Sequence, residues 1–365
     1  MRLPIRLKSS LSVLNRYRIR FLLWIALGWT LFDQLLWLGR PLSAGDTLFE
    51  STPNILQGLG IRALIVFGMS LFMGWLILFR FDKMFCLQKR LVNVAFKTLI
   101  LIAGSFIMNF LSQFAYFAFI QGYSVGHALQ LYWQLPSEKF WVIYGVPSWL
   151  LIFLSTQLLL EINQKYSPGV YRDILIGKYR TPQNENRIIL FLDLVDSTPI
   201  AEKLGHKVYF LFIRDFIRHV TEALLRNGAR IYQYVGDEIV VSWPLDTNSG
   251  KKSLAALVEA RKSLQQHADH YRRHYGMVPE FRAGLHVGEV TIGEIGVIKR
   301  DLAMSGDTMN TTARIRTACR ELNSRYTVSK DFLNQVPLSN FQTEPLGKIE
   351  LKGKKEGLEL FALKM

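Results

Sequence analysis

The sequence predicts an α-helical membrane domain with four transmembrane helices (residues 1–160), a connector (161–186) and an α+β domain (187–365). Three observations support this division. The first half contains four apolar runs of about the 17–25 residues that a helix needs to cross a bilayer core. The chain turns polar after residue 160. Beyond the connector, strand patterns alternate with helix patterns and hairpins, which is typical of an α+β sheet with helices on one face.

The apolar runs define the expected spans, and the distribution of Lys and Arg defines their orientation. The runs are Phe21–Leu38, Ile61–Phe79, Thr98–Phe117 and Phe140–Leu160. Basic residues gather before the first run and between the second and third, whereas the other two links are poor in them. Links rich in Lys and Arg face the cytoplasm. We therefore expect an integral protein of the cell (inner) membrane, with both termini and the α+β domain in the cytoplasm.

The overall composition fits a membrane protein. Half of the residues (50%) are hydrophobic, and 44 Lys+Arg against 29 Asp+Glu give a net charge of +15. So apolar a chain is neither disordered nor collagen-like. The basic residues beside the spans account for much of the charge, so the lipid bilayer is an expected partner and nucleic acid is not. The two cysteines, Cys86 and Cys319, exclude a disulfide scaffold and a cysteine-based zinc site.

Asp33 lies inside the first apolar run. A carboxylate within a bilayer is costly and commonly functional, so a sensing or proton site is one interpretation. The other interpretation is a residue near the outer interface, or one that faces water inside the helix bundle.

The second half shows its strand and helix patterns in a clear order. Apolar periodicity and turn residues predict a strand, a helix, two strands around a Gly-Asp turn, a helix, two strands around Gly288, a helix and a hairpin. Their ranges are Arg187–Leu194, Lys203–Asn227, Ala229–Trp243, Ser253–Tyr275, Arg282–Val287 with Glu289–Ile295, Asp307–Leu322 and Ile349–Leu363. His267, His270 and His274 are expected on a solvated helix face rather than at a zinc site.

Two aspartates that follow apolar strands are the main candidates for chemistry. Asp193 lies in Phe-Leu-Asp-Leu-Val-Asp, and Asp237 lies in Tyr-Val-Gly-Asp-Glu. A carboxylate at the end of a buried strand is costly unless it binds a cation or caps a turn. For each aspartate alone, capping a turn is the simpler interpretation. As a pair in one domain, they predict a site for Mg²⁺ or Mn²⁺, whose ligands are oxygens.

Three further residues suggest nucleotide binding. Asn310 and Arg314 are four positions apart and share one face of a predicted helix. An asparagine amide can contact a sugar or a ring, and an arginine presents a planar fork to phosphate. Lys352 in Leu-Lys-Gly-Lys-Lys is another candidate for phosphate. The simpler interpretations are a helical surface pair and a solvated hairpin tip. The sequence has no Gly-x₄-Gly-Lys-Ser/Thr loop, which excludes a P-loop NTPase.

Taken together, these segments resemble a known family. From about Arg187 to Leu363, FLDLVDST, YQYVGDEIV, FRAGLHVGEVTIGEIG, SGDTMNTTARI and IELKGKKEGLELF are similar, in order and spacing, to the catalytic domain of class III adenylate/guanylate cyclases. The four spans that precede them suggest the membrane-anchored bacterial type. The resemblance implies a ferredoxin-like (βαββαβ) core that works as a homodimer, with two equivalent active sites at the subunit interface.

The resemblance also implies a role for each matched residue. Asp193 and Asp237 correspond to the two metal aspartates, and the backbone carbonyl of Leu194 is a further metal ligand. The expected cofactors are two Mg²⁺ or Mn²⁺ per active site. Asn310 corresponds to the residue that orients the ribose, and Arg314 corresponds to the transition-state arginine. The family takes the two aspartates from one subunit and the asparagine and arginine from the other.

The remaining matched positions concern the nucleotide. Lys352 corresponds to a lysine that binds the terminal phosphates. Gln233, expected on the same subunit as the two aspartates, and Ala303 stand where adenylate cyclases usually have Lys and Asp or Thr. We expect ATP to be the substrate and 3′,5′-cyclic AMP and pyrophosphate to be the products, for intracellular signalling. The alternatives are a guanylate cyclase that makes cyclic GMP from GTP, and a nucleotide-binding receptor domain without turnover.

Overall fold

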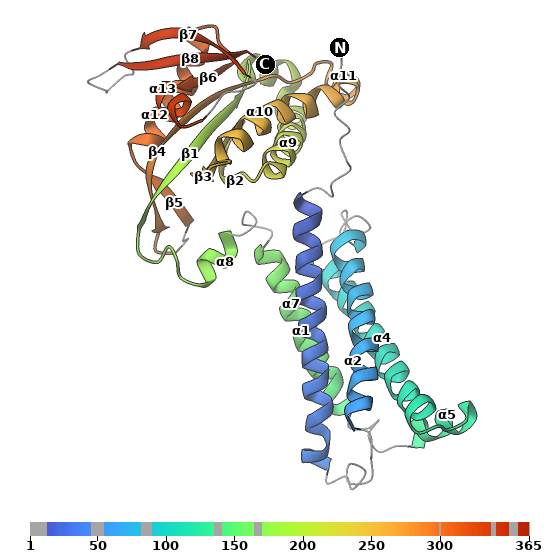
Figure 1. Ribbon diagram of the computed structural model, residues 1–365. Coiled ribbons are helices and arrows are strands. Elements are labelled where there is room, and N and C mark those ends of the chain that lie inside the picture. Colours follow the sequence, from blue (N-terminus) through green and yellow to red (C-terminus); the bar gives the residue numbers. More distant parts are fainter. Residues whose placement is uncertain are drawn as a thin grey trace, which may run out of the picture. The chain divides into compact units, whose positions relative to one another are not determined.

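The computed structural model describes residues 13–44, 55–81, 90–134, 141–163, 170–298, 301–336, 341–349 and 357–364. The chain divides into a helical unit within Asn15–Lys165 and a sheet unit within Tyr166–Met365 (Figure 1). The helical unit contains the α-helices α1 (Val13–Ala44), α2 (Ile55–Trp75), α4 (Arg90–Ala115), α5 (Val125–Gln134) and α7 (Val146–Asn163), and the π-helical segments η2 (Leu76–Phe81), η3 (Tyr116–Ile120) and η4 (Trp141–Gly145).

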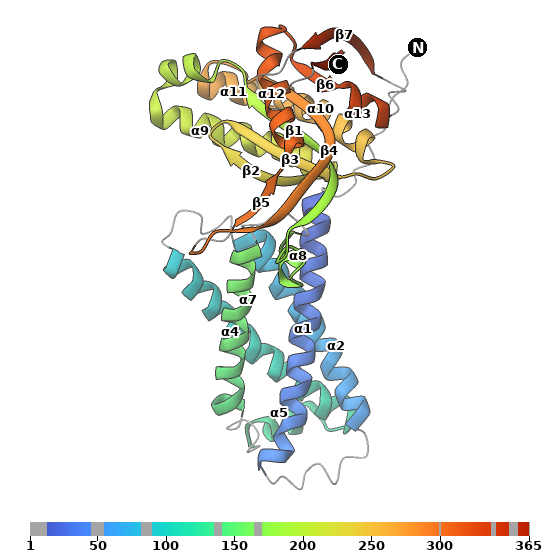
Figure 2. The same ribbon diagram turned by 90° about the vertical axis from the view of Figure 1, so that its left-hand side faces the viewer.

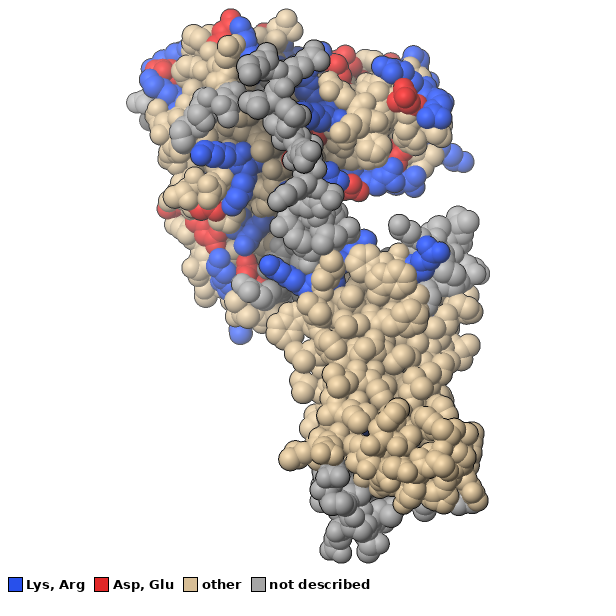
Figure 3. Space-filling model, turned by 45° about the vertical axis from the view of Figure 1, so that its right-hand side comes forward, with Lys and Arg blue, Asp and Glu red and all other residues tan. Residues whose placement is uncertain are grey.

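Within the described residues, four helical segments are long and apolar enough to cross a membrane. They are Arg18–Leu38, Leu56–Arg80, Val92–Ile120 and Ile143–Ile162, and each overlaps one of the spans predicted from the sequence. On the face shown in Figure 3, the helical unit displays almost no charged side chains, whereas many lie on the sheet unit. This contrast is what a lipid-facing surface requires, because lipid offers no partners to a charge.

Aromatic side chains form the centre of the helical unit. Trp29 of α1 lies edge-on to Phe153 of α7 at 4.9 Å between ring centroids, and its Nε1 donates a hydrogen bond to Thr156 Oγ1 at 3.1 Å. Asp33 is also inside this unit and is only 1% exposed. Arg62 of α2 donates to its Oδ2 through Nε at 2.6 Å and to its Oδ1 through Nη2 at 2.8 Å. Asp33 is therefore held in a bidentate ion pair between two helices.

The sheet unit is built around a ferredoxin-like core, as the resemblance implied. After α8 (Val170–Leu175), its elements are β1 (Gln183–Leu194), α9 (Ser197–Arg226), β2 (Arg230–Val235), β3 (Glu238–Pro244), α10 (Ser249–Gln266), α11 (Ala268–Tyr275), β4 (Phe281–Ile295), β5 (Asp301–Ser305), α12 (Asp307–Glu321), β6 (Tyr326–Ser329), α13 (Lys330–Gln335), β7 (Gln342–Ile349) and β8 (Leu358–Lys364). The strands form one sheet in the order β2-β3-β1-β4-β6-β8-β7. The first four strands are mutually antiparallel neighbours, and β4 pairs with β6 in parallel.

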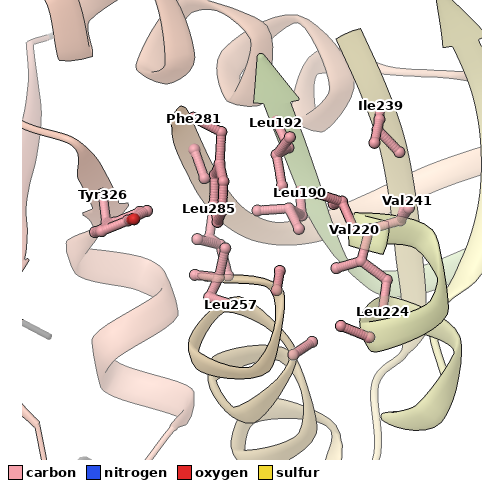
Figure 4. Packing of buried hydrophobic residues seen from close by; sticks show 14 of the residues in the cluster. Leu190, Leu192, Val220, Leu224, Ile239, Val241, Leu257, Phe281, Leu285 and Tyr326 are labelled. Atoms are coloured by element: carbon pink, nitrogen blue, oxygen red, sulfur yellow. The ribbon is translucent and has the colours of Figure 1, made fainter. Parts of the chain in front are cut away.

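One face of the sheet packs on α9 and α10. Alternate residues of β1, β3 and β4 point to this face and interdigitate with apolar residues of the two helices (Figure 4). Leu190, Ile239 and Leu285 from the strands and Phe216 and Leu257 from the helices are all fully buried. The alternation has the period of two that a strand with one apolar face requires.

The expectation that all helices cover one face was wrong, because α12 lies against the other face. Two glycines of β4 make room for it. A Cβ on Gly284 would stand 2.6 Å from the backbone nitrogen of Arg316, and one on Gly288 would stand 2.5 Å from Thr308 Oγ1. Gly288 therefore marks a close approach of a helix rather than the expected turn, and β4 runs unbroken from Phe281 to Ile295 (Figure 2). Glycine in a strand often marks such a contact.

Two other boundaries also differ from the prediction. The helix expected over Ser253–Tyr275 is divided at His267 into α10 and α11. The closing hairpin uses β7 and β8, so its first arm begins before the expected Ile349, and residues 350–356 lie outside the described residues.

His267 and His274 are exposed as expected, but Nε2 of the half-buried His270 lies 3.0 Å from Asp215 Oδ2. Among the described residues, no cluster of three or more metal-binding side chains occurs.

Candidate active site

Strand register brings the two candidate metal aspartates together. Asp193 is the penultimate residue of β1, and Asp237 belongs to the tight turn between β2 and β3. Gly236 has φ of +62°, a conformation that glycine adopts without strain, and it allows the turn to close. Because Leu192 of β1 pairs with Ile239 of β3, the end of β1 lies directly beside this turn.

The electrostatics of the pair confirm their proximity. Burial of Asp193 and the negative charge of Asp237 raise the pKa of Asp193 to about 6, although the charge of Arg316 opposes this rise. Burial likewise raises the pKa of the adjacent Glu238. Oδ2 of Asp237 is buried, and no described residue donates a hydrogen bond to it. Two close carboxylates, one with a buried oxygen that lacks a donor, are arranged as ligands for a cation.

The oxygens at this end of the sheet fit Mg²⁺ or Mn²⁺. The side chain of Leu194 is buried and has no atom that can bind a metal, so any ligand from this residue is its backbone carbonyl. Mg²⁺ is usually held by one or two carboxylates together with substrate phosphates rather than by a full protein cage. Two carboxylates are thus enough protein ligands for such an ion.

Arg316 and Glu238 also belong to this site and were missed in the sequence. Arg316 of α12 places Nη1 3.3 Å from Asp193 Oδ2 and Nη2 2.5 Å from Glu238 Oε2. The signals available were weak: Glu238 directly follows Asp237, and Arg316 lies two positions after Arg314. Neither spacing predicts an ion pair between residues 123 positions apart, as Asp193 and Arg316 are.

The same helix directs Asn310 and Arg314 away from the aspartates. A helix turns by about 100° per residue, so Arg314 and Arg316 leave α12 on nearly opposite sides. Asn310 is exposed and Arg314 is partly exposed, and within the described part of the chain neither forms an ion pair or hydrogen bond with Asp193 or Asp237. A single chain therefore brings the two aspartates together but does not bring Asn310 and Arg314 to them.

The two candidate base-binding positions lie on β2 and β5, which are not adjacent strands of the sheet. The pairing of β2 with β3 shifts register between Ile231 and Gln233, which leaves Tyr232 in a bulge. The hydroxyl of Tyr232 accepts a hydrogen bond from the backbone N–H of Met304 at 3.0 Å, and this contact joins β2 to β5. Gln233 is exposed, and Ala303 pairs with Gly293 of β4. Lys352, the candidate for the terminal phosphates, lies outside the described residues.

Comparison with known proteins identifies the family of this fold. The family model of the adenylate and guanylate cyclase catalytic domain matches residues 180–365, more than half of the chain. The chain belongs to this cyclase family. The matched residues include Asp193, Gln233, Asp237, Asn310 and Arg314. The family prediction made from the motifs is therefore confirmed.

Relatives of the cyclase chain include both adenylate and guanylate cyclases. Adenylate cyclase 2 of Rhizobium meliloti (strain 1021) is 33% identical over 232 residues, which are 63% of this chain and 62% of that protein. Guanylate cyclase 2D of Rattus norvegicus is 28% identical over 204 residues, 54% of this chain and 18% of that protein. The chain thus matches less than two thirds of the length of either relative.

A solved structure shows the same fold. The structure of a bacterial light-regulated adenylyl cyclase matches this cyclase with a TM-score of 0.52 and 19% sequence identity. The match covers 60% of this chain and 64% of the other. At this level of identity the likeness concerns the fold alone.

Proposed function

We propose that the protein is a membrane-bound adenylate cyclase that converts ATP into 3′,5′-cyclic AMP and pyrophosphate at a homodimer interface. The observation that carries the proposal is the pairing of Asp193 with Asp237, while Arg314 leaves α12 on the side away from them. A second copy of the chain would supply the missing half of each site, as two-fold symmetry allows. The name of the relative at 33% identity, adenylate cyclase 2, supports ATP as the substrate.

The reaction requires the 3′-hydroxyl of the ribose to attack the α-phosphorus in line while pyrophosphate leaves. Two Mg²⁺ or Mn²⁺ held by Asp193, Asp237 and the Leu194 carbonyl would lower the pKa of that hydroxyl and stabilise phosphate oxygens. Asn310 would hold the ribose in an attack geometry. Arg314 would donate hydrogen bonds to the oxygens of the α-phosphate, where negative charge develops. Lys352 would bind the terminal phosphates.

The choice of base depends on Gln233 and Ala303. Adenine offers an N6 donor and an N1 acceptor, whereas guanine offers an O6 acceptor and an N1–H donor. The amide of Gln233 can present either its NH₂ or its C=O, and Ala303 contributes no polar group. A pocket rejects the wrong base strongly only when its polar groups would be left unpaired. We therefore expect a modest preference for ATP, about tenfold, or about 1.4 kcal/mol.

A single assay tests the proposal. The full-length protein, purified in detergent, is incubated with Mn²⁺ and with ATP and GTP at equal concentration, and both cyclic products are measured. We expect both products with an excess of cyclic AMP. A clear excess of cyclic GMP would support the guanylate cyclase alternative. Absence of both cyclic products, with ATP binding shown separately by equilibrium dialysis, would support a receptor domain without turnover.

A further inference from the structure

An arginine side chain contacts the carboxylates at the candidate metal site. The guanidinium of Arg316 lies between Asp193 and Glu238, with Nη1 3.3 Å from Asp193 Oδ2 and Nη2 2.5 Å from Glu238 Oε2. The three side chains are largely shielded from solvent, with exposures of 28%, 25% and 14% for Arg316, Asp193 and Glu238. Charges in such a partly buried setting interact more strongly than charges on an open surface.

The backbone of Arg316 is packed closely against the sheet. Its backbone rests on Gly284 of β4, where a Cβ would stand 2.6 Å from the Arg316 nitrogen and 3.0 Å from its Cα. The preceding residue, Ile315, is fully buried with Leu360 of β8. These contacts hold the backbone of α12 against the sheet, so we expect the side chain of Arg316, rather than the helix, to move when the charge at the site changes.

Some buried polar atoms of this site lack hydrogen-bond partners. Oδ2 of Asp237 has no hydrogen-bond donor among the described residues, and Nε of Arg316 has no acceptor among them. Oε2 of Glu238 lies beside Arg316 Nη2 as an ion pair, without the geometry of a hydrogen bond. One guanidinium thus faces the carboxylates of Asp193 and Glu238, while no Lys or Arg in the described part of the chain forms an ion pair with Asp237. A divalent ion that binds between Asp193 and Asp237 would lie within a few ångströms of a fixed positive charge.

We propose that Arg316 is a positioning residue that lowers the affinity of the Asp193–Asp237 pair for divalent metal by competing for Asp193. The inference shares with the proposed function the assumption that Asp193 and Asp237 bind metal. It does not require that the protein forms a cyclic nucleotide. Like charges held this close repel, and the repulsion is strong because the site is partly buried. Metal binding must therefore overcome both the repulsion and the Arg316–Asp193 contact.

The test measures Mn²⁺ binding to the full-length protein in detergent, without nucleotide, from the electron paramagnetic resonance signal of free Mn²⁺. Arg316→Gln should bind Mn²⁺ about tenfold more tightly than the wild type, because it removes the charge. Arg316→Lys keeps the positive charge but loses the guanidinium that contacts both Asp193 and Glu238, so its affinity for Mn²⁺ should lie between those of the wild type and Arg316→Gln. Arg320→Gln is the matched control, since it removes an exposed arginine one turn further along α12, and it should have little effect.

Two outcomes of the Mn²⁺ titrations contradict the proposal. Unchanged or weaker Mn²⁺ binding in Arg316→Gln would overturn it, as would Arg316→Lys behaving like Arg316→Gln. Should Arg316→Gln fail to fold, Arg316→Met removes the same charge and retains an unbranched stem, and the same tightening is expected. Asp193→Ala must abolish Mn²⁺ binding, so that the protein no longer lowers the signal of free Mn²⁺, or the metal site itself is wrong. Tighter Mn²⁺ binding in Arg316→Gln, together with no cyclic product from the wild-type protein, would leave the inference standing and refute the cyclase proposal.

Discussion

Leu192 of β1 lies directly opposite Ile239 of β3, and this register places Asp193 beside the turn that carries Asp237. Both apolar side chains are fully buried, whereas the two carboxylates lie at the edge of the packed core. Buried apolar residues such as Leu192 and Ile239 therefore hold the two strands in place, and the aspartates themselves contribute little to the packing of the core.

Removing either carboxylate should therefore abolish activity without unfolding the protein. We expect no detectable cyclic product from Asp193→Ala or Asp237→Ala, and a melting temperature close to that of the wild type. Product formation and thermal unfolding are measured on the same preparations. Asp196→Asn is a suitable control, because Asp196 is exposed with φ of +54°, which asparagine tolerates. Substantial activity in either alanine variant would show that the pair does not hold the metal.

Arg314→Ala should lower kcat by about 10²–10³-fold, the usual scale for losing one donor to a transition state. If the two halves of each site come from different protomers, mixing Arg314→Ala with Asp193→Ala chains should restore part of the activity. One of the two sites in such a mixed dimer is intact. Each variant chain alone provides the baseline. Lack of recovery in dimers proven to be mixed would refute the shared site.

His219 should make the sheet unit less stable in acid. Its Nδ1 lies 2.8 Å from the hydroxyl of Tyr271, and its ring stacks on His267 at 3.9 Å between centroids. Burial, together with the positive charges of His267 and Arg218, lowers the pKa of His219 to about 4, although Asp215 opposes this. The unfolded chain, with a pKa near 6.5, binds the proton first as pH falls, so stability is lost from about pH 6.5 towards pH 4.

The measurement compares urea unfolding of the wild type and His219→Gln at pH 7 and pH 5. The wild type should lose about 1–2 kcal/mol more than the variant between these values. The comparison is needed because the raised pKa of Asp193 acts in the opposite direction over the same range. Equal pH dependence in the two proteins would show that His219 is not the group responsible.

Breaking the ion pair inside the helical unit should be costly. Asp33→Leu would leave the buried guanidinium of Arg62 without its carboxylate, and removing one partner of a buried pair costs about 3–5 kcal/mol. Replacing both residues, in Asp33→Leu with Arg62→Met, should recover most of the loss. Thermal unfolding in detergent distinguishes the two cases. A single variant as stable as the wild type would mean that the pair contributes nothing to stability.

The predicted orientation can be tested with one introduced thiol. Asp46 lies in the link between the first two spans, which is poor in Lys and Arg and so is expected outside the cytoplasm. In Asp46→Cys, an impermeant maleimide added to intact cells should label this thiol. Cys86, in the basic link, is the internal control and should react only after the membrane is opened. Labelling of Asp46→Cys from the cytoplasmic side alone would reverse the topology.

Much of the fold was predictable because its signals are local. Apolar runs located β1 and the four spans, and the Gly-Asp turn located Asp237. The errors arose where a distant partner decides the structure. Gly288 resembles a turn residue in sequence, but it serves the approach of α12. The bond of Arg316 to Asp193 and that of Arg62 to Asp33 join separate elements, and no spacing pattern along the chain encodes either one.

The pairing of Asp33 with Arg62 has a consequence for how the chain enters a membrane. The two residues belong to consecutive helices and are only 29 positions apart. A carboxylate or a guanidinium that meets lipid alone is costly, but a neutral pair is far less so. The first two helices are thus suited to enter the bilayer together as a helical hairpin. In such a hairpin Asp33 and Arg62 can form their ion pair before either side chain is exposed to lipid.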